Sequence, residues 1–426
     1  DARVHVTTEE GEHLTRFWPG ADGTFEVAVD PRAARLWAFR AGEPLVGPVP
    51  IGEGEAELTL GPVGRLELEV TDPDGVPLPA RVEVLPLDGA PPTAPPAFGE
   101  VVPGRGRSHV AFPTDGRAAF ELPPGRHRVR ATRGPEYRRF ERDVEVVDGE
   151  TLALAPVLAR VVDTTGVMCA DYHIHTHRSV DSPDPGAFKV AGLVADGLEI
   201  PIRSEHEFVS DFAPIVAELG LEDWAFGLAG LEITTFLYGH FGAFPLEPRP
   251  AEAGLGAVPW AGRLAPALFD AVRRRPEAPA LIINHPRAGG LRQGYFEVAG
   301  YDPETGAVER PELWDDGFRV LEVFNESDFE SNRDGTVRDW FSLLRSGRRV
   351  FAVGSSDSHR ILEVPVGYPR TCLRLGTDDP RALSAEAVRR ATVNGHGHVS
   401  GGIYLEVVGP DGARPGDEAR GVGERA

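Results

Sequence analysis

Two histidines separated by a single residue end an apolar run near the middle of the chain, in the segment Asp171–His177. The run before them, Gly166–Ala170, is predicted to be a short buried strand. Because side chains at positions i and i+2 of a strand point to the same side, His173 and His175 would face one centre together. Two imidazoles on one strand face form half of a transition-metal site. Metal binding is therefore the first chemistry that the sequence predicts.

Four further segments in the second half of the chain place metal-ligand side chains just after a predicted strand. They are Ser204–Glu207, Glu232 with His240, Asn284–Arg287 and Ser355–His359, while Asp181 follows the first histidine pair. A single histidine at a strand end is as often a structural residue as a ligand. Five successive strand ends that each offer His, Asp or Glu instead indicate one shared centre. Since no cysteine takes part, the donor set favours Zn, Mn or Fe.

The elements that must position these residues show alternating strand and helix patterns. Strands are predicted over residues 167–175, 199–204, 225–233, 241–244, 280–284, 319–324 and 350–354, and helices over 186–197, 211–219, 263–274, 336–346 and 385–392. Repeated strand–helix units predict a parallel sheet, either open or closed into a barrel. One more strand is predicted over residues 403–408, and with a polar tail it makes a C-terminal segment of residues 401–426.

The first 160 residues show a different pattern, with period-two alternation between Gly- and Pro-rich turns. Residues 1–62 are predicted to form a small β module, and residues 63–160 a second all-β unit. Within the second unit, VTDPDGVPLPARVEV (residues 70–84) and GRAAFELPPGRHRVRA (residues 116–131) resemble the carboxypeptidase-regulatory-like, transthyretin-type β-sandwich. Modules of this type seldom carry catalysis, so the chemistry is assigned to the second half of the chain.

Composition restricts the class of protein and its partners. A chain of 426 residues suits two or three domains. The net charge of −22 argues against a nucleic-acid partner, and the absence of an apolar run of about 18 residues argues against a membrane span. Cys169 and Cys372 lie in apolar strand-like runs and are predicted to be buried, reduced thiols rather than a disulfide. The β modules and the missing initiator methionine favour a periplasmic or secreted protein, with a cytoplasmic location as the alternative.

Five motifs in a fixed order carry a family resemblance. The segments DYHIHTHRSVDS, SEHE, GLEITT with GHF, NHPR and GSSDSH resemble the polymerase and histidinol phosphatase (PHP) superfamily of metallohydrolases. GLEITT with GHF, together with GYPRT, is most similar to its carbaryl-hydrolase-like branch, the CehA/McbA type. The resemblance covers roughly residues 167–400, within a predicted domain of residues 166–400. It implies an α/β fold, a distorted (β/α)7 barrel preceded by one or two β-sandwich modules, with two or three divalent metals.

The resemblance implies nine metal ligands in three overlapping sets. The first set is His173, His175, Glu232 and Asp357; the second shares Glu232 and adds His240 and His285; the third is Asp181, His206 and His359. The chain departs from the commonest family pattern at two positions. Glu205 stands where an aspartate usually precedes the histidine, and Asp181 stands where some relatives have histidine, which puts the third set in doubt. His177 has no counterpart among the ligands and is interpreted as structural.

Such a centre predicts an enzyme, a metal-dependent hydrolase that acts on ester bonds. Metal ions a few ångströms apart lower the pKa of a bridging water. Glu232 would bridge two ions, and Asp357 or His359 could protonate the leaving oxygen. Arg287 and Arg370 are candidates for clamping a substrate anion, with salt bridges or loop anchors as the alternative.

Three hypotheses for the function follow, and the ligands alone do not separate them. The first is hydrolysis of a small-molecule phosphate ester, and the second is hydrolysis of a carbamate or carboxyl ester. The third is a secreted, non-catalytic binding protein that uses metals for stability. A pocket rich in arginine would favour a phosphate, whereas an apolar pocket with Phe236, Trp260 or Trp314 would favour an aryl ester.

Overall fold

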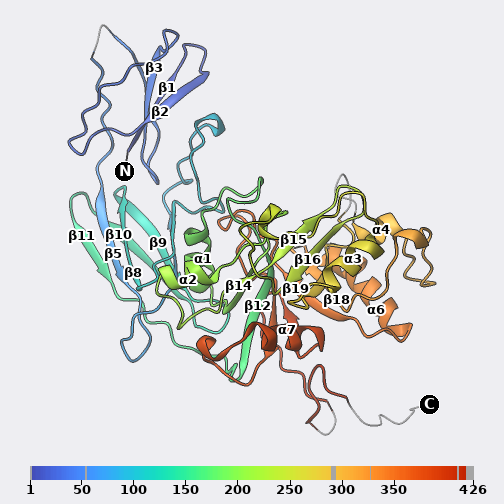
Figure 1. The fold of residues 1–426 in the computed structure, drawn as a ribbon. Helices are drawn as coiled ribbons and strands as arrows, with labels where there is room; N and C mark the ends of the chain where they lie inside the picture. The colour runs from blue at the N-terminus through green and yellow to red at the C-terminus, as the bar shows by residue number, and fades with distance from the viewer. Residues whose placement is uncertain (1, 53–54, 289–293, 327, 410–411, 419–426) are drawn as a thin grey trace. The chain divides into compact units, whose positions relative to one another are not determined.

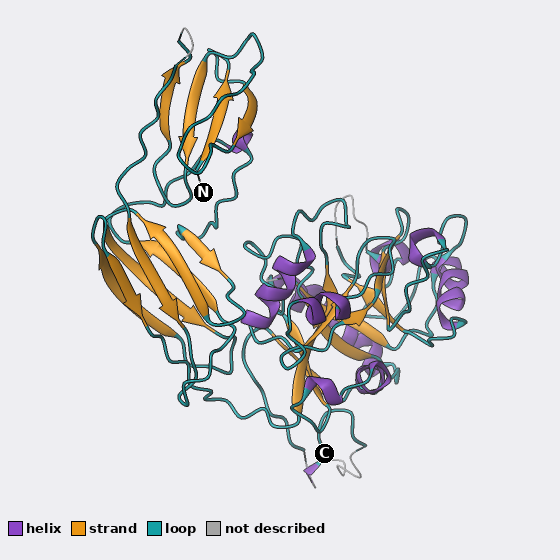
Figure 2. Cartoon of the chain, turned by 60° about the vertical axis from the view of Figure 1, so that its left-hand side comes forward, coloured by secondary structure: helices purple, strands orange, loops and turns teal. Residues whose placement is uncertain are grey.

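The computed structural model describes residues 2–52, 55–288, 294–326, 328–409 and 412–418 (Figure 1). The chain divides into two compact units, the first made of residues 1–132 and 138–159, the second of residues 133–137 and 160–426. The described α-helices all belong to the second unit, while the first contains strands, loops and one short 3-10 helix at Pro96–Phe98 (Figure 2).

The first unit begins with a four-stranded antiparallel sheet. Its strands, in spatial order, are β2 (His13–Phe17), β1 (Arg3–Thr7), β3 (Arg35–Phe39) and β4 (Val46–Pro50). Val4, Val6 and Leu36 are buried on this sheet, as the period-two pattern requires.

The rest of the first unit has β-sandwich character. One sheet contains β10 (Phe140–Val146), β9 (Gly125–Thr132), β6 (Arg81–Pro86) and β7 (His109–Ala111); the other contains β11 (Thr151–Leu154), β5 (Gly64–Glu69) and β8 (Arg117–Leu122). Along β5, buried Leu66 and Leu68 alternate with exposed charged residues. The alternation therefore predicts correctly that each sheet buries one face.

The second unit contains two five-stranded sheets. The first has the order β14 (Leu228–Ala229), β13 (Ile200–Arg203), β12 (Val167–Ile174), β20 (Arg370–Arg374) and β21 (Gly397–Ser400). The second has the order β15 (Leu231–Thr234), β16 (His240–Phe244), β17 (Ala280–Asn284), β18 (Val320–Asn325) and β19 (Phe351–Ser355).

The predicted (β/α)7 barrel is wrong. Among the described residues the strands of the second unit form two separate ladders, joined only by single-residue bridges such as the pair Ile174 and Ser358. Each ladder also mixes directions: β20 lies antiparallel to β12 and to β21, and β16 lies antiparallel to β15 and to β17. A strand–helix alternation does not reveal strand direction, and the short β15–β16 hairpin breaks the parallel repeat.

Helices follow several of these strands. They are α1 (Gly186–Ala195), α2 (Ala213–Glu218), α3 (Ala265–Arg273), α4 (Tyr295–Ala299), α5 (Phe329–Asn332), α6 (Arg338–Arg345) and α7 (Ala385–Val393). Leu268 and Phe269 of α3 pack into a core with Phe241 of β16 and Ile283 of β17. Val388 of α7 packs into a second core with strands of both sheets. These two cores hold the strand ends in place.

The two cysteines form a disulfide, so the prediction of free thiols is wrong. Cys169 of β12 and Cys372 of β20 are directly opposite each other in the antiparallel ladder, with Cα atoms 3.8 Å apart. Because the strand pairing was not readable from the sequence, the proximity of residues 203 positions apart could not be predicted.

The chain after β21 differs from the prediction. Residues 403–408 form no strand, and residues 419–426 of the predicted tail lie outside the described part of the chain. None of the described helices is long and apolar enough to cross a membrane.

Candidate metal centre

The ends of strands in both sheets of the second unit bring the nine predicted ligands to one place. His173 is in β12 and His175 follows it directly, while His206 follows β13. Glu232 lies in β15 and pairs with Gly242 of the antiparallel strand β16. His240 is two residues before Gly242 in β16, so it lies near Glu232. The turns after β17 and β19 supply His285, Asp357 and His359.

Glu232 is the central residue of the cluster and is fully buried. Its Oε1 lies 3.0 Å from His173 Nε2, 3.3 Å from His285 Nε2 and 3.4 Å from His240 Nδ1. Its Oε2 lies 2.8 Å from His206 Nδ1. One carboxylate therefore contacts four imidazoles from four different strand ends.

Asp357 joins the first histidine pair, and Asp181 joins the remaining two ligands. Asp357 Oδ1 is 3.3 Å from the Nε2 atoms of both His173 and His175. Asp181 Oδ2 is 3.1 Å from His206 Nε2 and 3.3 Å from His359 Nε2. Asp181 thus lies beside His206 and His359, the two histidines of the third predicted set.

The separations between these atoms match the spacing of ligands on a shared ion. Two ligand atoms each about 2.1 Å from one ion, at angles of 90° to 109°, lie about 3.0 to 3.4 Å apart. Three groups meet the requirement that all ligand atoms lie within 4.8 Å of one another: His173, Glu232 and His285; His173, His175 and Asp357; and His175, His206 and His359. The structure therefore contains His, Glu and Asp groups that could hold metal ions.

Buried polar atoms without hydrogen-bond partners give an independent test of fit. Among the described side chains, such atoms include the Nε2 atoms of His173, His175 and His359, as well as Asp357 Oδ1. An unsatisfied buried polar atom costs about 1–3 kcal/mol, and four in one cluster need an explanation. Cations placed between them would satisfy all four, so the residues fit a metal centre.

The other ring nitrogen of each of these histidines is held by the protein. His173 Nδ1 is 3.2 Å from Glu322 Oε1, and His359 Nδ1 is 2.8 Å from the backbone oxygen of Asp357. His175 Nδ1 is 3.0 Å from Ser179 Oγ. Because a carboxylate or carbonyl oxygen can only accept, the Nδ1 atoms of His173 and His359 donate, so the neutral form of each ring has its lone pair on Nε2. This is the tautomer that a metal ligand requires.

The charges of the cluster depend on one another. Burial opposes ionisation of Glu232, but the surrounding imidazoles, with His173 first, outweigh it and hold its pKa well below the usual range. Burial likewise opposes protonation of His173, but the carboxylates of Asp357, Glu232 and Glu322 raise its pKa well above the usual value. The carboxylates thus stay ionised and attract positive charge to the site.

Two of the ligands have unusual backbone conformations. His285 has a φ of 23° and Asp357 a φ of 51°, in the left-handed region that few residues other than glycine adopt. Such conformations cost of order 1–3 kcal/mol and persist only where surrounding contacts impose them. Their occurrence at two ligands is typical of a functional site.

Neither predicted arginine is available to clamp a substrate anion. The Arg287 guanidinium pairs with Asp339, at 2.5 Å and 2.8 Å, and also donates to the Tyr301 carbonyl. Arg370 is fully buried and donates to the backbone oxygens of Asp196, Gly197 and Gly367. Both arginines therefore act as structural anchors, which was the alternative interpretation. His177 is exposed, as its structural assignment allows.

Supporting residues were not predicted as such. Glu322 of β18 is buried and contacts both His173 and the backbone nitrogen of His285. Glu205 is also buried and accepts from Ser179 Oγ at 2.7 Å, which orients the hydroxyl that faces His175. Glu205 is therefore a supporting residue in this chain. A carboxylate next to a predicted ligand or at the end of a buried strand is the signal that could have identified either one.

Apolar side chains are exposed beside the ligands. Val180 precedes Asp181 and is 100% exposed, and Phe236, in the hairpin between Glu232 and His240, is 84% exposed. Phe236 contacts the Trp260 ring edge-on, with 5.3 Å between centroids. Phe208, two residues after His206, is also exposed. Large apolar groups in water near a candidate site favour an apolar ligand.

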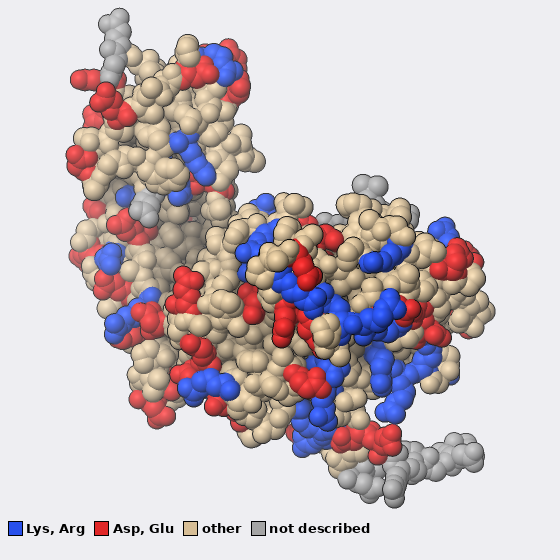
Figure 3. All heavy atoms as spheres, in the orientation of Figure 1, with Lys and Arg blue, Asp and Glu red and all other residues tan. Residues whose placement is uncertain are grey.

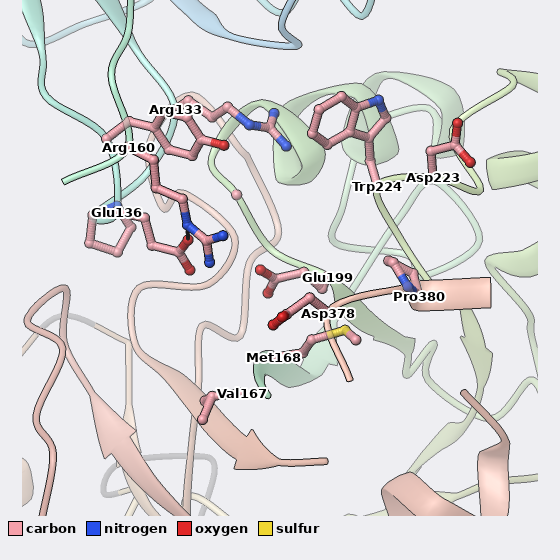
Figure 4. A pocket seen from close by; sticks show the side chains of 13 residues that line it. Arg133, Glu136, Arg160, Val167, Met168, Glu199, Asp223, Trp224, Asp378 and Pro380 are labelled. Carbon is pink, nitrogen blue, oxygen red and sulfur yellow. Dashed lines mark hydrogen bonds and ion pairs between the residues drawn. The ribbon is translucent and has the colours of Figure 1, made fainter. Parts of the chain in front are cut away.

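A separate pocket lies at the opposite end of β12. It has a volume of about 120 Å³ and is lined by Met168 and Glu199 among others (Figure 4). Met168 is five residues before His173, so about 16 Å of strand separates the pocket from the cluster. Two of its arginines are engaged, Arg160 with Glu136 at 2.8 Å and Arg133 with the Trp224 ring at 4.1 Å. The pocket is therefore distinct from the metal centre.

Charged side chains of both signs are interspersed on the face in Figure 3. Arginines of the second unit pair with neighbouring carboxylates, as Arg273 does with Asp315 and Arg389 with Glu386.

Comparisons with known proteins give little further information. No family model matches the chain, and no curated protein matches it. Among solved structures, similarity was found to the Bacillus anthracis TIE protein (16% identity, TM-score 0.19, 38% of this chain and 31% of that one). It was also found to BcpA, the major pilin subunit of Bacillus cereus (14%, 0.19, 30% and 38%), and to a 3-chlorocatechol 1,2-dioxygenase from Rhodococcus opacus 1CP (11%, 0.18, 28% and 64%). The chain matches about a third of the first two, and these TM-scores are too low to assign fold or function.

Proposed function

We propose that the protein is a metal-dependent hydrolase of ester bonds with a multinuclear His/Asp/Glu centre. The observation that carries the proposal is the set of buried Nε2 atoms of His173, His175 and His359, which have no hydrogen-bond partner and lie 3.0–3.3 Å from carboxylate oxygens of Glu232, Asp357 and Asp181. A structural zinc site needs only four ligands, whereas nine ligand-type side chains meet here. That surplus favours several ions and a catalytic role over a stabilising one.

Divalent ions bound at this site would supply an acidified water and polarise the ester bond. The protein residues have separate tasks. Glu232 holds imidazoles from four strand ends around its two oxygens and so sets the spacing within the cluster. His359 and His206, whose Nε2 atoms lie 3.3 Å and 3.1 Å from Asp181 Oδ2, would complete the ligand set of a further ion.

A phosphate ester is the first candidate substrate. A pocket that concentrates several cations stabilises the charge that develops on phosphoryl oxygens, and it does so without an arginine clamp. The proposal therefore does not depend on Arg287 or Arg370, whose guanidiniums are engaged elsewhere.

A carbamate or carboxyl ester is the second candidate, and the apolar residues beside the ligands favour it. Phe236 and Trp260 present aromatic surface next to the hairpin that carries Glu232 and His240. Such a surface would bind the aryl or alkyl part of a neutral ester.

The disulfide supports an extracytoplasmic location. Cysteines in the cytoplasm are kept reduced, whereas the Cys169–Cys372 bond requires an oxidising compartment. We accordingly propose that the protein works in the periplasm or outside the cell.

Substrates with one common leaving group separate the two chemistries. The protein would be reconstituted with Zn, Mn or Fe and assayed on 1-naphthyl phosphate, 1-naphthyl acetate and 1-naphthyl N-methylcarbamate. Turnover of the phosphate supports the first candidate, and turnover of only the other two supports the second. Glu232→Gln should abolish activity, while Phe341→Ala, an exposed change on α6, should retain it. If metal binds and none of the esters is hydrolysed, both candidates are wrong.

A further inference from the structure

Lys189 is the only lysine of a chain that contains 44 lysine and arginine residues. It lies in α1, and its side chain is completely buried. A buried lysine is rare unless it has a specific partner. Every other lysine-or-arginine position of the chain is arginine. The single lysine therefore indicates that arginine does not fit at position 189.

The contacts of the ammonium group explain this requirement. Lys189 Nζ lies 2.7 Å from Asp184 Oδ2, 3.0 Å from the Ser358 backbone oxygen and 3.3 Å from Ser358 Oγ. The Ser358 hydroxyl donates its own hydrogen to the Val364 carbonyl, which leaves its oxygen free to accept. Three acceptors thus match the three hydrogens of an ammonium group. A guanidinium would bring five donors in a plane and leave at least two unpaired.

One partner of Lys189, Ser358, belongs to the turn that carries two of the predicted metal ligands. Ser358 stands between Asp357 and His359, and its backbone oxygen also accepts from the backbone nitrogen of His175 at 3.2 Å. The same carbonyl therefore connects α1, the end of β12 and the turn after β19.

The second partner holds the far side of the same turn. Asp184 Oδ2 accepts from the backbone nitrogen of Ile361 at 2.7 Å, and Ser182 Oγ donates to the His359 carbonyl at 2.6 Å. Asp357 itself has a φ of 51°, a conformation that surrounding contacts must impose. Without Lys189, Ser358 would lose both of its contacts to α1.

We propose that Lys189 is a positioning residue that locks the segment 357–361 in the conformation in which Asp357 and His359 face the metal centre. It acts through Ser358 and Asp184 and touches neither ligand nor substrate. The role of Lys189 in metal binding rests on the proposed metal-dependent function. The role of Lys189 in ordering the segment 357–361 does not depend on that function.

The metal-binding test uses Lys189→Arg and Lys189→Met in the full chain, with the exposed change Phe341→Ala on α6 as the control. After reconstitution with Zn²⁺, both Lys189 variants should bind one ion fewer, or bind it at least tenfold more weakly by calorimetry, because His359 and Asp357 are misplaced. The control should match the wild type. Variants that are folded and bind zinc with unchanged number and affinity would overturn the proposal.

The second test is made on metal-free protein. Hydrogen exchange measured by mass spectrometry should be at least tenfold faster for residues 356–361 in Lys189→Arg, and unchanged over β16 and β17. Asp184→Asn, which keeps an oxygen for the Ile361 amide, provides a milder variant if the Lys189 changes prevent folding and should show the same local effect. Unchanged exchange in folded variants would refute the positioning role, whereas a wild type that binds no metal would refute only the proposed function.

Discussion

Glu322 offers a sharp test of how the metal centre is supported, because it touches two ligand residues without belonging to the centre. Its Oε1 accepts a hydrogen bond from His173 Nδ1 at 3.2 Å. Its Oε2 accepts from the backbone nitrogen of His285 at 2.6 Å and from the side-chain amide of Asn325 at 3.1 Å. Glu322→Gln keeps the size and one acceptor oxygen. It replaces the other oxygen with an NH2 group, which cannot accept from His173.

The size of the effect follows from this single lost acceptor. The His173 ring must then turn, change tautomer or lose its hydrogen bond. Each of these changes makes His173 Nε2 a poorer metal ligand. Loss of such a carboxylate behind a metal-bound histidine typically weakens metal affinity 10- to 100-fold, or about 1.4–2.8 kcal/mol. We expect a loss in this range for zinc in Glu322→Gln.

The assay is a competition titration with a chromophoric chelator, performed on Glu322→Gln and on Glu207→Gln. Glu207 is the matched control because it also lies next to the ligands, but its Oε1 accepts from the backbone nitrogen of Thr234 and not from an imidazole. Glu207→Gln should bind zinc like the wild type. If Glu322→Gln binds zinc with wild-type affinity, or if both variants lose the same amount, the role assigned to Glu322 is wrong.

Three other predictions concern the disulfide, a buried carboxyl and the apolar residues beside the ligands. Replacing Cys169 and Cys372 by serine should lower the free energy of unfolding by about 2–5 kcal/mol in urea titrations, because the disulfide closes a loop of 203 residues. A reductant should have no further effect on the stability of this variant. Equal stability of variant and wild type would contradict the stabilising role of the disulfide. Burial, reinforced by a nearby carboxylate, raises the pKa of Glu199 to about 7, so the folded state binds its proton more tightly than the unfolded state does. The contribution of Glu199 to the free energy of unfolding should therefore fall as the pH rises from about 4.5 to 7, by at most about 3 kcal/mol. Glu199→Gln should remove that part of the pH dependence. Parallel curves of stability against pH for variant and wild type would show that the pKa of Glu199 is not raised. Phe236→Ala should raise KM for naphthyl esters by about 2- to 10-fold, as the loss of one aromatic contact implies, and leave KM for a methyl ester unchanged. Phe341→Ala, an exposed change on α6, is the control. A wild-type KM for naphthyl esters in Phe236→Ala would exclude Phe236 from the substrate site.

Several strands and helices of the second unit were predicted from the sequence, but α4, α5 and β21 were not, the strand predicted over residues 403–408 is absent, and the assembly of the elements was not readable. The apolar runs before His173 and His285 predict strands that the structure contains, because burial on both faces leaves a continuous apolar signature. The direction of β16 leaves no such signature, since a strand has the same composition either way. The predicted barrel failed at that point, and the disulfide was missed because the pairing of β12 with β20 was unknown.

The nine ligands lie together even though the predicted fold is wrong. Their proximity depends on the strand ends, to which the apolar runs of the sequence pointed, whereas the individual ligands were implied by the family resemblance. Glu322 and Lys189 could not be assigned in the same way, because a carboxylate in β18 and a lysine in α1 acquire their roles only through contacts with distant segments. Arg287 and Arg370 show the converse: their positions suggested an anion clamp, and their contacts show that the guanidiniums are engaged by the protein itself.

The most direct test of the account is the metal content of the intact chain. Protein stripped with a chelator, reconstituted separately with Zn²⁺ and Mn²⁺ and freed of excess ions should contain two to three equivalents by elemental analysis. Glu232→Gln, which removes the carboxylate shared by four imidazoles, should retain at most one. Fewer than two equivalents in the wild type with both metals, or an unchanged metal content in Glu232→Gln, would contradict the multinuclear centre.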